Sequence, residues 1–236
     1  MDKEKIYSGD EFAALLNSPN YYNWILDTFR PYLSGQVTEI GAGIGTFSEL
    51  LLPNVETLCL VEPSANLNLK LLERFSLNNR VTISQATLED FIKKPKPTLQ
   101  DAIVLINVLE HIEEDAKAIM GLAKNLKVGG TLLLFVPALP FLFSKLDADF
   151  GHYRRYTLPN LVKIVEESGL NIMEKSYFDF LGVAPWWLIN TMGKSTNLNP
   201  KMVGLYDTIG VPITRFMEGL ISPPIGKNII IAAKKI

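Results

Sequence analysis

The sequence predicts a doubly wound α/β fold with a mostly parallel sheet. Short apolar segments of strand length alternate with segments of helical periodicity, an order that is typical of parallel sheets. The first strand runs directly into a glycine-rich turn at residues 41–45, which opens a helix. With 236 residues, 47% of them hydrophobic and 20% charged, the chain suits one globular domain spanning 1–236.

Residues 1–33 are expected to form an N-terminal helical cap. Apolar side chains recur at helical spacing in this segment and predict a helix over residues 11–33. They are Tyr22, Ile25, Leu26 and Phe29.

Strands and helices then alternate to the end of the chain. Strands are expected at residues 37–40, 57–61, 81–84, 101–106, 131–136, 170–178 and 228–233. Helices are expected at residues 47–52, 67–75, 88–92, 115–126 and 157–169. Gly129 and Gly130 are predicted to stop the helix before them, and Thr157 is the predicted N-cap of the last helix. Residues 93–97 and 138–156 are expected to be loops.

Residues 179–226 are irregular in sequence and form a predicted insertion or lid before the last strand. This segment is rich in proline and in large apolar residues, with Trp186 and Trp187 next to each other. It could line an apolar acceptor pocket, form a homodimer face, touch a membrane, or simply pack on the domain.

Composition excludes several classes of protein. The net charge of −2 gives no general basic field for a nucleic-acid partner. The single cysteine, Cys59, cannot form an intrachain disulfide and is assigned no chemistry. The sequence has no apolar signal core at its N-terminus and no uninterrupted apolar stretch long enough to span a bilayer. A cytoplasmic location is expected, with peripheral contact to a membrane or a lipid-linked substrate left open.

The glycine-rich turn is the most informative motif. Gly41, Gly43 and Gly45 alternate after the first strand and let a ligand lie directly on the backbone. The helix that follows offers free N–H groups to that ligand. The spacing G-x-G-x-G places the third glycine one residue too early for a pyrophosphate-binding motif. Glu39, two residues before the first glycine, would repel a diphosphate but could hold an ammonium group. This combination favours S-adenosylmethionine as the cofactor.

Other strand ends should meet this turn in one crevice. Glu62 ends the second strand, where an acid accepts both hydroxyls of a ribose. Residues 85–89 follow the third strand and could flank an adenine, while Asn107 ends the fourth strand. The complete predicted cofactor set is Tyr21, Tyr22, Glu39, Gly41, Gly43, Gly45, Glu62, Pro63, Ala86, Thr87, Leu88, Asn107 and Val108.

In these motifs the chain resembles the class I S-adenosylmethionine-dependent methyltransferases over roughly residues 20–178. The resemblance rests on the turn at 39–45, Glu62, the Asn107–Ile112 loop and residues 129–137. It implies a Rossmann-like sheet of seven strands, with the antiparallel C-terminal strand between strands five and six. Residues 20–25, 151–156 and 223–226 are similar to a narrower bacterial subgroup of small-molecule methyltransferases, often associated with glycan, lipid or secondary-metabolite pathways.

The two histidines, His111 and His152, are the catalytic candidates. Each follows the end of a strand on the predicted site side, and histidine suits proton transfer near neutral pH. Some related methyltransferases use Glu-x-x-Glu-His and a downstream histidine to bind a divalent cation. Here Asn107 replaces the first acid, so no metal is expected.

The loop at residues 151–156 follows the fifth strand and is the predicted acceptor site. Arg154 and Arg155 either grip an acidic group of the acceptor or form salt bridges with Asp147 or Asp149. The predicted acceptor-binding residues are Tyr153, Arg154, Arg155, Tyr156 and Trp186.

The sequence therefore indicates a methyltransferase that moves a methyl group from S-adenosylmethionine to an oxygen or nitrogen of a small molecule. Sugars, lipid-linked compounds and natural-product scaffolds are the expected acceptors. Two alternatives stay open: a catalytically silent cofactor-binding or scaffolding protein of the same fold, and a nicotinamide-dependent oxidoreductase.

Overall fold

The protein is built around one seven-stranded sheet. The computed structural model describes residues 18–93 and 98–236; the predicted features within 1–17 and 94–97 lie outside this range. Strand order is β3-β2-β1-β4-β5-β7-β6. The strands are β1 Gln36–Ile40, β2 Thr57–Val61, β3 Val81–Ser84, β4 Gln100–Ile106, β5 Leu126–Pro137, β6 Leu170–Phe178 and β7 Asn228–Lys235.

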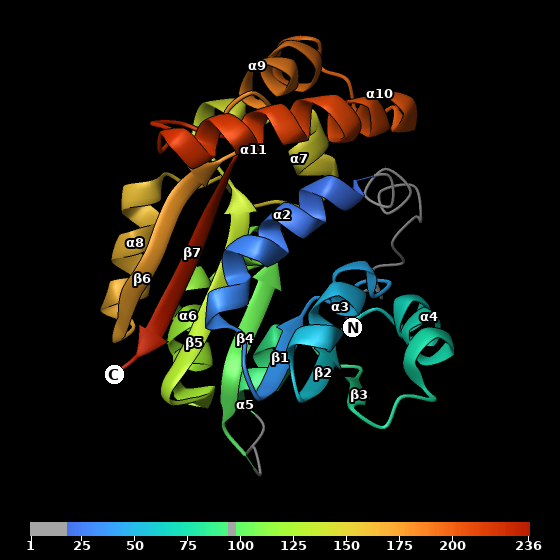
Figure 1. Cartoon of the computed structure of the whole chain (residues 1–236), viewed down its shortest axis with the longest axis vertical. Coiled ribbons are helices and arrows are strands. Elements are labelled where there is room, and N and C mark those ends of the chain that lie inside the picture. Colours follow the sequence, from blue (N-terminus) through green and yellow to red (C-terminus); the bar gives the residue numbers. More distant parts are fainter. Residues whose placement is uncertain (1–17, 94–97) are drawn as a thin grey trace.

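The sheet is parallel except for its last strand. β1 pairs in parallel with β2 and β4, and β5 pairs in parallel with β4. β7 lies antiparallel between β5 and β6 (Figure 1). This confirms the predicted Rossmann-like sheet and the place of its C-terminal strand.

Side-chain alternation along the central strands explains why both faces are covered by helices. In β4, Ile103 and Leu105 point into one core, while Ala102 and Val104 point into the other. Helices α5, α6 and α8 cover the first face, and α2, α3 and α4 cover the second. A strand buried on both faces needs apolar residues at consecutive positions, as the sequence indicated.

The helices follow the expected order with shifted ends. They are α2 Pro19–Phe29, α3 Thr46–Leu51, α4 Ala65–Phe75, α5 Leu88–Lys93, α6 Asp115–Asn125, α7 Lys145–Asp149, α8 Leu158–Glu167, α9 Val183–Trp186, α10 Pro200–Leu205 and α11 Val211–Leu220. The hydroxyl of Thr157 accepts a hydrogen bond from the Asn160 N–H, so Thr157 caps α8 as predicted.

Gly129 and Gly130 have a different role from the predicted one. Helix α6 ends at Asn125, and β5 begins at the next residue, so both glycines lie within the strand. Gly129 has φ of +83°, and a Cβ on Gly130 would stand 2.9 Å from the Gln100 carbonyl oxygen. The glycines therefore absorb an irregularity in the β4–β5 pairing rather than ending a helix.

Two segments expected to be irregular contain helices. Residues 138–156 include α7, whose Ser144 and Asp147 form a capping box. Residues 179–226 are mostly helical, with π-helical segments Trp187–Met192 and Tyr206–Gly210 continuing α9 and linking α10 to α11. We call residues 183–220 the helical lid. It lies across the edge of the sheet where β4 and β5 end (Figure 1).

In the described part of the chain, no helix combines the length and the apolar character that crossing a bilayer requires.

Gly45 allows α3 to approach α4 closely. It has φ of +84°, and a Cβ there would stand 2.5 Å from Cε2 of Phe75 and 3.0 Å from Cδ2 of Leu71. We predict that Gly45→Ala lowers the free energy of unfolding by about 2–4 kcal/mol, measured by urea denaturation.

Gly169→Ala is the matched control, because Gly169 has φ of +83° and nothing within 4 Å of its added Cβ. It should cost only the backbone strain, about 1–2 kcal/mol. Equal losses in the two variants would show that packing against Phe75 plays no part.

Candidate active site

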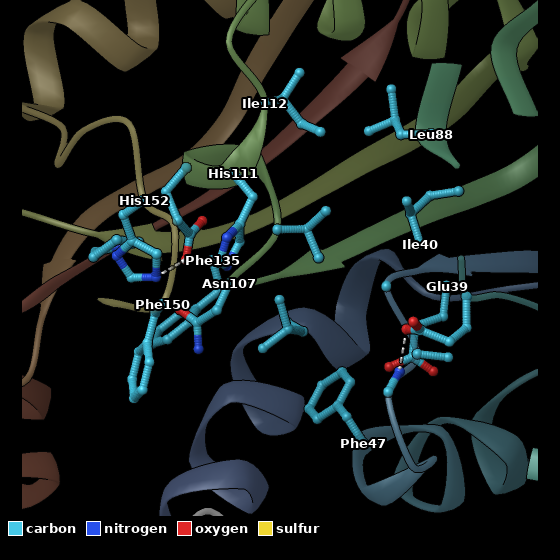
Figure 2. Close-up of a pocket in the computed structure, with 18 of the residues that line it drawn as sticks. Glu39, Ile40, Phe47, Leu88, Asn107, His111, Ile112, Phe135, Phe150 and His152 are labelled. Atoms are coloured by element: carbon cyan, nitrogen blue, oxygen red, sulfur yellow. Dashed lines mark hydrogen bonds and ion pairs between the residues drawn. The ribbon is translucent and has the colours of Figure 1, made fainter. Parts of the chain in front are cut away.

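A cavity of about 510 Å³ opens at the carboxyl ends of the parallel strands. Its walls come from the ends of β1, β2, β4 and β5, from α2, from the segment containing Phe150 and His152, and from the lid. Figure 2 shows two distinct ends: Glu39, Ile40 and Leu88 lie at one, while Asn107, His111, Phe135, Phe150 and His152 gather at the other. We call these the glycine-loop end and the histidine end.

The glycine loop is held to the neighbouring strand by Glu62. The Gly43 N–H donates to one carboxylate oxygen of Glu62 at 2.9 Å, and the Ser64 N–H donates to the other at 2.9 Å. Burial raises the pKa of Glu62, although these two bonds oppose the shift. A carboxylate has about four acceptor positions, so Glu62 keeps capacity to accept hydrogen bonds from a ligand.

Gly41 and Gly43 both line the cavity, with φ of +73° and +57°. A Cβ on Gly41 would stand 2.4 Å from Cγ2 of Val108. The loop from β4 therefore packs directly on the glycine loop, which only a glycine permits.

Glu39 lies beneath the loop in full burial and accepts a hydrogen bond from the Ser48 hydroxyl. Burial raises its pKa to about 8, with the Ser48 bond opposing. The carboxyl thus ties the end of β1 to helix α3, and it also lines the cavity.

The segments after β2 and β3 form a largely apolar wall at the glycine-loop end. Pro63 follows β2, and Ala86, Thr87 and Leu88 follow β3; all four line the cavity, and Ala86 and Leu88 are buried. The Thr87 hydroxyl accepts from the Asp90 N–H and so begins α5. A flat apolar ring fits this wall.

Asn107 and Val108, in the turn after β4, also line the cavity. Asn107 has φ of +52°, a left-handed conformation that asparagine tolerates better than most residues. Its N–H donates to the Phe135 carbonyl at 2.8 Å, which fixes the turn after β4.

Tyr21 and Tyr22 reach the cavity from the first turn of α2. Asp207 of the lid accepts hydrogen bonds from the N–H groups of Asn20 at 3.1 Å and Tyr21 at 2.9 Å. A carboxylate at a helix N-terminus is favoured by the helix dipole. The Tyr21 hydroxyl donates to Asn228 at 2.9 Å, so β7 also positions this ring.

The histidine end contains three candidate proton carriers or ligands. The rings of His111 and His152 meet edge to face, with centroids 4.6 Å apart. Nε2 of His152 lies 3.9 Å from Oε1 of Glu110. Glu110 is fully buried, and neither of its carboxylate oxygens has a hydrogen-bond partner among residues 18–93 and 98–236. Burial raises its pKa to about 8, so it holds a proton at neutral pH.

Among the described residues, Glu110, His111 and His152 also form a cluster of side chains that could hold a metal ion. Their ligand atoms lie within 4.8 Å of one another. Two imidazoles and a carboxylate suit Zn²⁺ or a similar ion. That no metal is required stays a prediction.

Asp147 organises the loop that carries His152. Its carboxylate accepts from Nδ1 of His152 at 3.1 Å, from Nε of Arg155 at 2.8 Å and from the Ser144 hydroxyl at 2.7 Å. Burial alone would raise its pKa, but these partners outweigh it and lower the pKa to about 2. Because Asp147 accepts a hydrogen bond from Nδ1–H, the proton stays on Nδ1 and the Nε2 lone pair of His152 is free to accept a proton in the cavity.

The predicted acceptor residues divide into two groups. Arg155 and Trp186 line the cavity, with the Arg155 guanidinium 4.6 Å from the centre of the Trp186 ring. Arg155 forms an ion pair with Asp147, which is one of the two salt bridges that the sequence analysis offered as an alternative to acceptor binding. Because Asp147 neutralises the charge of Arg155, the structure gives no support to the binding of an acidic acceptor group by this side chain.

Tyr153, Arg154, Tyr156 and Gly45 do not line the cavity. Arg154 bonds to Asp115 at 2.7 Å and to the Glu113 carbonyl, away from both acids named from the sequence. The buried Tyr156 hydroxyl donates to Asp115 at 2.9 Å, and Tyr153 is exposed. These side chains secure the loop against the segment after β4.

Sequence reasoning missed several cavity residues. Glu110 lies within the Asn107–Ile112 loop on which the family resemblance rests, but nothing in the spacing showed that it would line the cavity without a hydrogen-bond partner in the described part of the chain. Phe150, Leu198, Lys227 and Asn228 also line the cavity. Their approach depends on the path of the lid and on β7 returning beside β5, which periodicity does not reveal.

Comparison with known proteins assigns the class. A family model described as a methyltransferase domain matches residues 12–175, so the chain belongs to this methyltransferase family. An uncharacterised methyltransferase of Geobacillus sp. (strain WCH70) is 28% identical over 167 residues, covering 64% of this chain and 76% of the relative.

Two solved structures share the fold. An S-adenosylmethionine-dependent methyltransferase from Mesorhizobium loti matches with a TM-score of 0.65 at 12% identity, covering 93% of this chain and 100% of that one. Phosphoethanolamine N-methyltransferase 2 of Haemonchus contortus, in complex with S-adenosylmethionine, matches with a TM-score of 0.66 at 17% identity. That match covers 98% of this chain and 60% of the other. The chain is a class I methyltransferase, the class whose methyl donor is S-adenosylmethionine. The family and the cofactor predicted from the sequence are therefore confirmed.

Glu39 and Glu110 should make stability depend on pH. Both pKa values rise from 4.5 to about 8 on folding, so the folded chain binds more protons than the unfolded chain between these values. We predict that the free energy of unfolding falls as the pH rises from about 5 to about 8. In Glu110→Gln this fall should shrink by at least about 1 kcal/mol, measured by urea denaturation.

The matched control is Glu56→Gln, because Glu56 is exposed on the surface. Its pH dependence should follow that of the wild type. A Glu110→Gln profile identical to the wild type would show that Glu110 is ionised in the folded state.

Proposed function

We propose that this protein binds S-adenosylmethionine in the cavity and transfers its methyl group to an oxygen or nitrogen of an acceptor held at the histidine end. The observation that carries the proposal is the convergence of Gly41, Gly43 and Glu62 with the Asp147–His152 pair on one cavity. When bound, the cofactor supplies a methyl group on a sulfonium centre, activated for direct displacement.

The residues at the glycine-loop end fit this cofactor. Glu62 has acceptor capacity for the two ribose hydroxyls, and Ala86 and Leu88 offer an apolar face for adenine. The bare backbone at Gly41 and Gly43 accommodates the amino-acid part, with Asn107 beside it. Tyr21 lies at the histidine end of this path, where an aromatic face favours a cationic sulfonium.

The histidine end favours an acceptor whose reacting part carries no net charge. Arg155 is neutralised by Asp147, and Lys227 forms an ion pair with Asp179 at 2.7 Å. Four aromatic or apolar side chains line the cavity beside these neutralised cations: Phe135, Phe150, Trp186 and Leu198. A hydroxyl or amine on a sugar, lipid-linked or natural-product scaffold with an apolar body matches these surroundings.

His152 is the proposed general base. Asp147 accepts a hydrogen bond from its Nδ1–H and orients the ring, so Nε2 can take the proton from the acceptor as the methyl group arrives. His111 packs edge to face on the same ring and is the second candidate. The alignment of acceptor and methyl group supplies much of the rate, and the cavity walls provide it.

Calorimetry with S-adenosylhomocysteine and NAD, followed by an acceptor screen with labelled S-adenosylmethionine, tests the proposal. Binding of S-adenosylhomocysteine with turnover supports it. Binding without turnover of any acceptor would indicate the catalytically silent alternative. The nicotinamide-dependent alternative gains no support from the comparisons, and tight binding of NAD alone would revive it.

Gly43 tests the cofactor cradle. Gly43→Asp should lower the affinity for S-adenosylhomocysteine by about 100-fold or more, because its carboxylate would meet the ligand path and Glu62. Isothermal titration calorimetry measures the effect. The control Gly169→Asp also has a positive φ but open space around it, and it should bind like the wild type.

His152 tests the assigned base. His152→Ala should lower kcat by about 10²–10⁴-fold and change the affinity for S-adenosylhomocysteine little. The acidic limb of the kcat profile should flatten, because the group that must lose its proton is gone. Asp149→Asn, an exposed change in the adjacent helix α7, should retain activity.

Parallel losses of turnover and affinity in His152→Ala would point to a structural role instead. The same assays with a chelator separate acid–base catalysis from metal binding. Unchanged turnover agrees with the prediction of no metal, and loss that Zn²⁺ or Mg²⁺ restores would contradict it.

A further inference from the structure

The second half of the lid carries an apolar stripe on its outer side. α10, the segment Tyr206–Gly210 and α11 form one continuous helical stretch over residues 200–220. Large apolar side chains recur along it every three or four residues and are 49–70% exposed. They are Met202, Leu205, Ile209, Ile213, Phe216 and Leu220.

Three polar side chains of the same helix face inward. Asp207 and Thr214 are buried, and Asp207 binds the start of α2. Glu218 is partly buried and accepts a hydrogen bond from the Phe180 N–H at 2.8 Å. A surface helix of a globular protein normally buries its apolar stripe and exposes its polar one. Here Val211 is buried in the core, but the stripe of six apolar side chains stays exposed on the opposite side, so it requires something apolar to cover it.

The exposed charges of the lid have one sign. Lys194, Lys201 and Arg215 are exposed, whereas Asp207 is buried and burial raises the pKa of Glu218 to about 7. Arg215 shares Asp27 with Arg30, and that group of three keeps one net positive charge. An apolar stripe flanked only by exposed cations complements an anionic lipid surface.

We propose that the stripe at residues 202–220 docks the protein on the surface of a membrane containing anionic phospholipid. The helix would lie in the plane of the headgroups, with its apolar residues inserted and its cations among the phosphates. Docking does not depend on the proposed function. If the methyl-transfer proposal also holds, Trp186 and Leu198, which line the cavity from the same lid, would place the acceptor site beside the lipid.

Co-sedimentation with vesicles tests the proposal. The full chain should bind vesicles of phosphatidylcholine and phosphatidylglycerol, mixed at about three to one, and bind pure phosphatidylcholine about tenfold more weakly. The double variant Phe216→Ser/Leu220→Ser should bind the anionic vesicles at least about tenfold more weakly than the wild type. Leu77→Ser/Val128→Ser removes two apolar side chains that are equally exposed elsewhere and should bind normally.

Circular dichroism and calorimetry with S-adenosylhomocysteine establish that each variant is folded. Failure of the wild type to bind vesicles would overturn the proposal, as would equal binding by Phe216→Ser/Leu220→Ser. Light scattering tests whether the stripe instead binds a second copy of the chain. A concentration-dependent dimer that Phe216→Ser/Leu220→Ser abolishes would show this and would overturn the membrane proposal. Cofactor binding with no vesicle binding would leave the proposed function standing and remove this inference alone.

Discussion

The parallel register of β1 with β2 and β4 is the constraint on which the rest of the molecule depends. Ile40 lies opposite Val61 and Leu105, so these three strands end together at one edge of the sheet. A different part of the site follows each strand: the glycine loop follows β1, Glu62 follows β2 and the Asn107 turn follows β4. A slip of one residue would move every core side chain to the opposite face. The same apolar pairing that stabilises the sheet therefore brings the site residues together.

Buried carboxyl groups connect that edge to the surrounding helices. A buried acid is costly unless it is hydrogen-bonded or protonated. Glu39 and Glu62 hold α3 and the glycine loop, and Asp147 holds the loop of His152. Glu110 differs, because its oxygens have no hydrogen-bond partner in the described part of the chain and burial keeps it protonated near neutral pH. Because protonated Glu110 is neutral, it places no negative charge beside the His152 imidazole on the side that faces the cavity.

The sequence predicted what depends on local periodicity and on the ends of strands. The sheet, the glycine loop and the Glu62 position follow from short apolar strands and the residues directly after them. Of the predicted acceptor residues only Arg155 and Trp186 reach the cavity, because Arg154 and Tyr156 are drawn to Asp115, forty residues away in sequence. The roles of Gly129 and Gly130 were mistaken because a glycine pair has the same sequence signature at a helix end and at a strand irregularity. The helices of the lid were missed since prolines at helix starts, as at Pro200 and Pro212, look like breakers in sequence.

Long-range tertiary ties also explain how the lid is coupled to the site. The chain leaves β6 at Asp179 and returns into β7 at Lys227, and the buried carboxylate of Asp179 forms an ion pair with the partly buried Lys227 at 2.7 Å. The Lys227 ammonium lies 4.9 Å from the centre of the Tyr21 ring, so the same ion pair also braces a cavity wall. Asp207 holds the other side of that wall through the backbone of Tyr21. Removing one partner of a buried pair leaves an uncompensated charge, so these ties favour a single position of the lid. Tyr21 is therefore fixed both by the Asp179–Lys227 pair, where the chain enters and leaves the lid segment, and by Asp207 within the lid. Anything that contacts the outer face of the lid therefore acts on a helix that is hydrogen-bonded directly to the cavity wall.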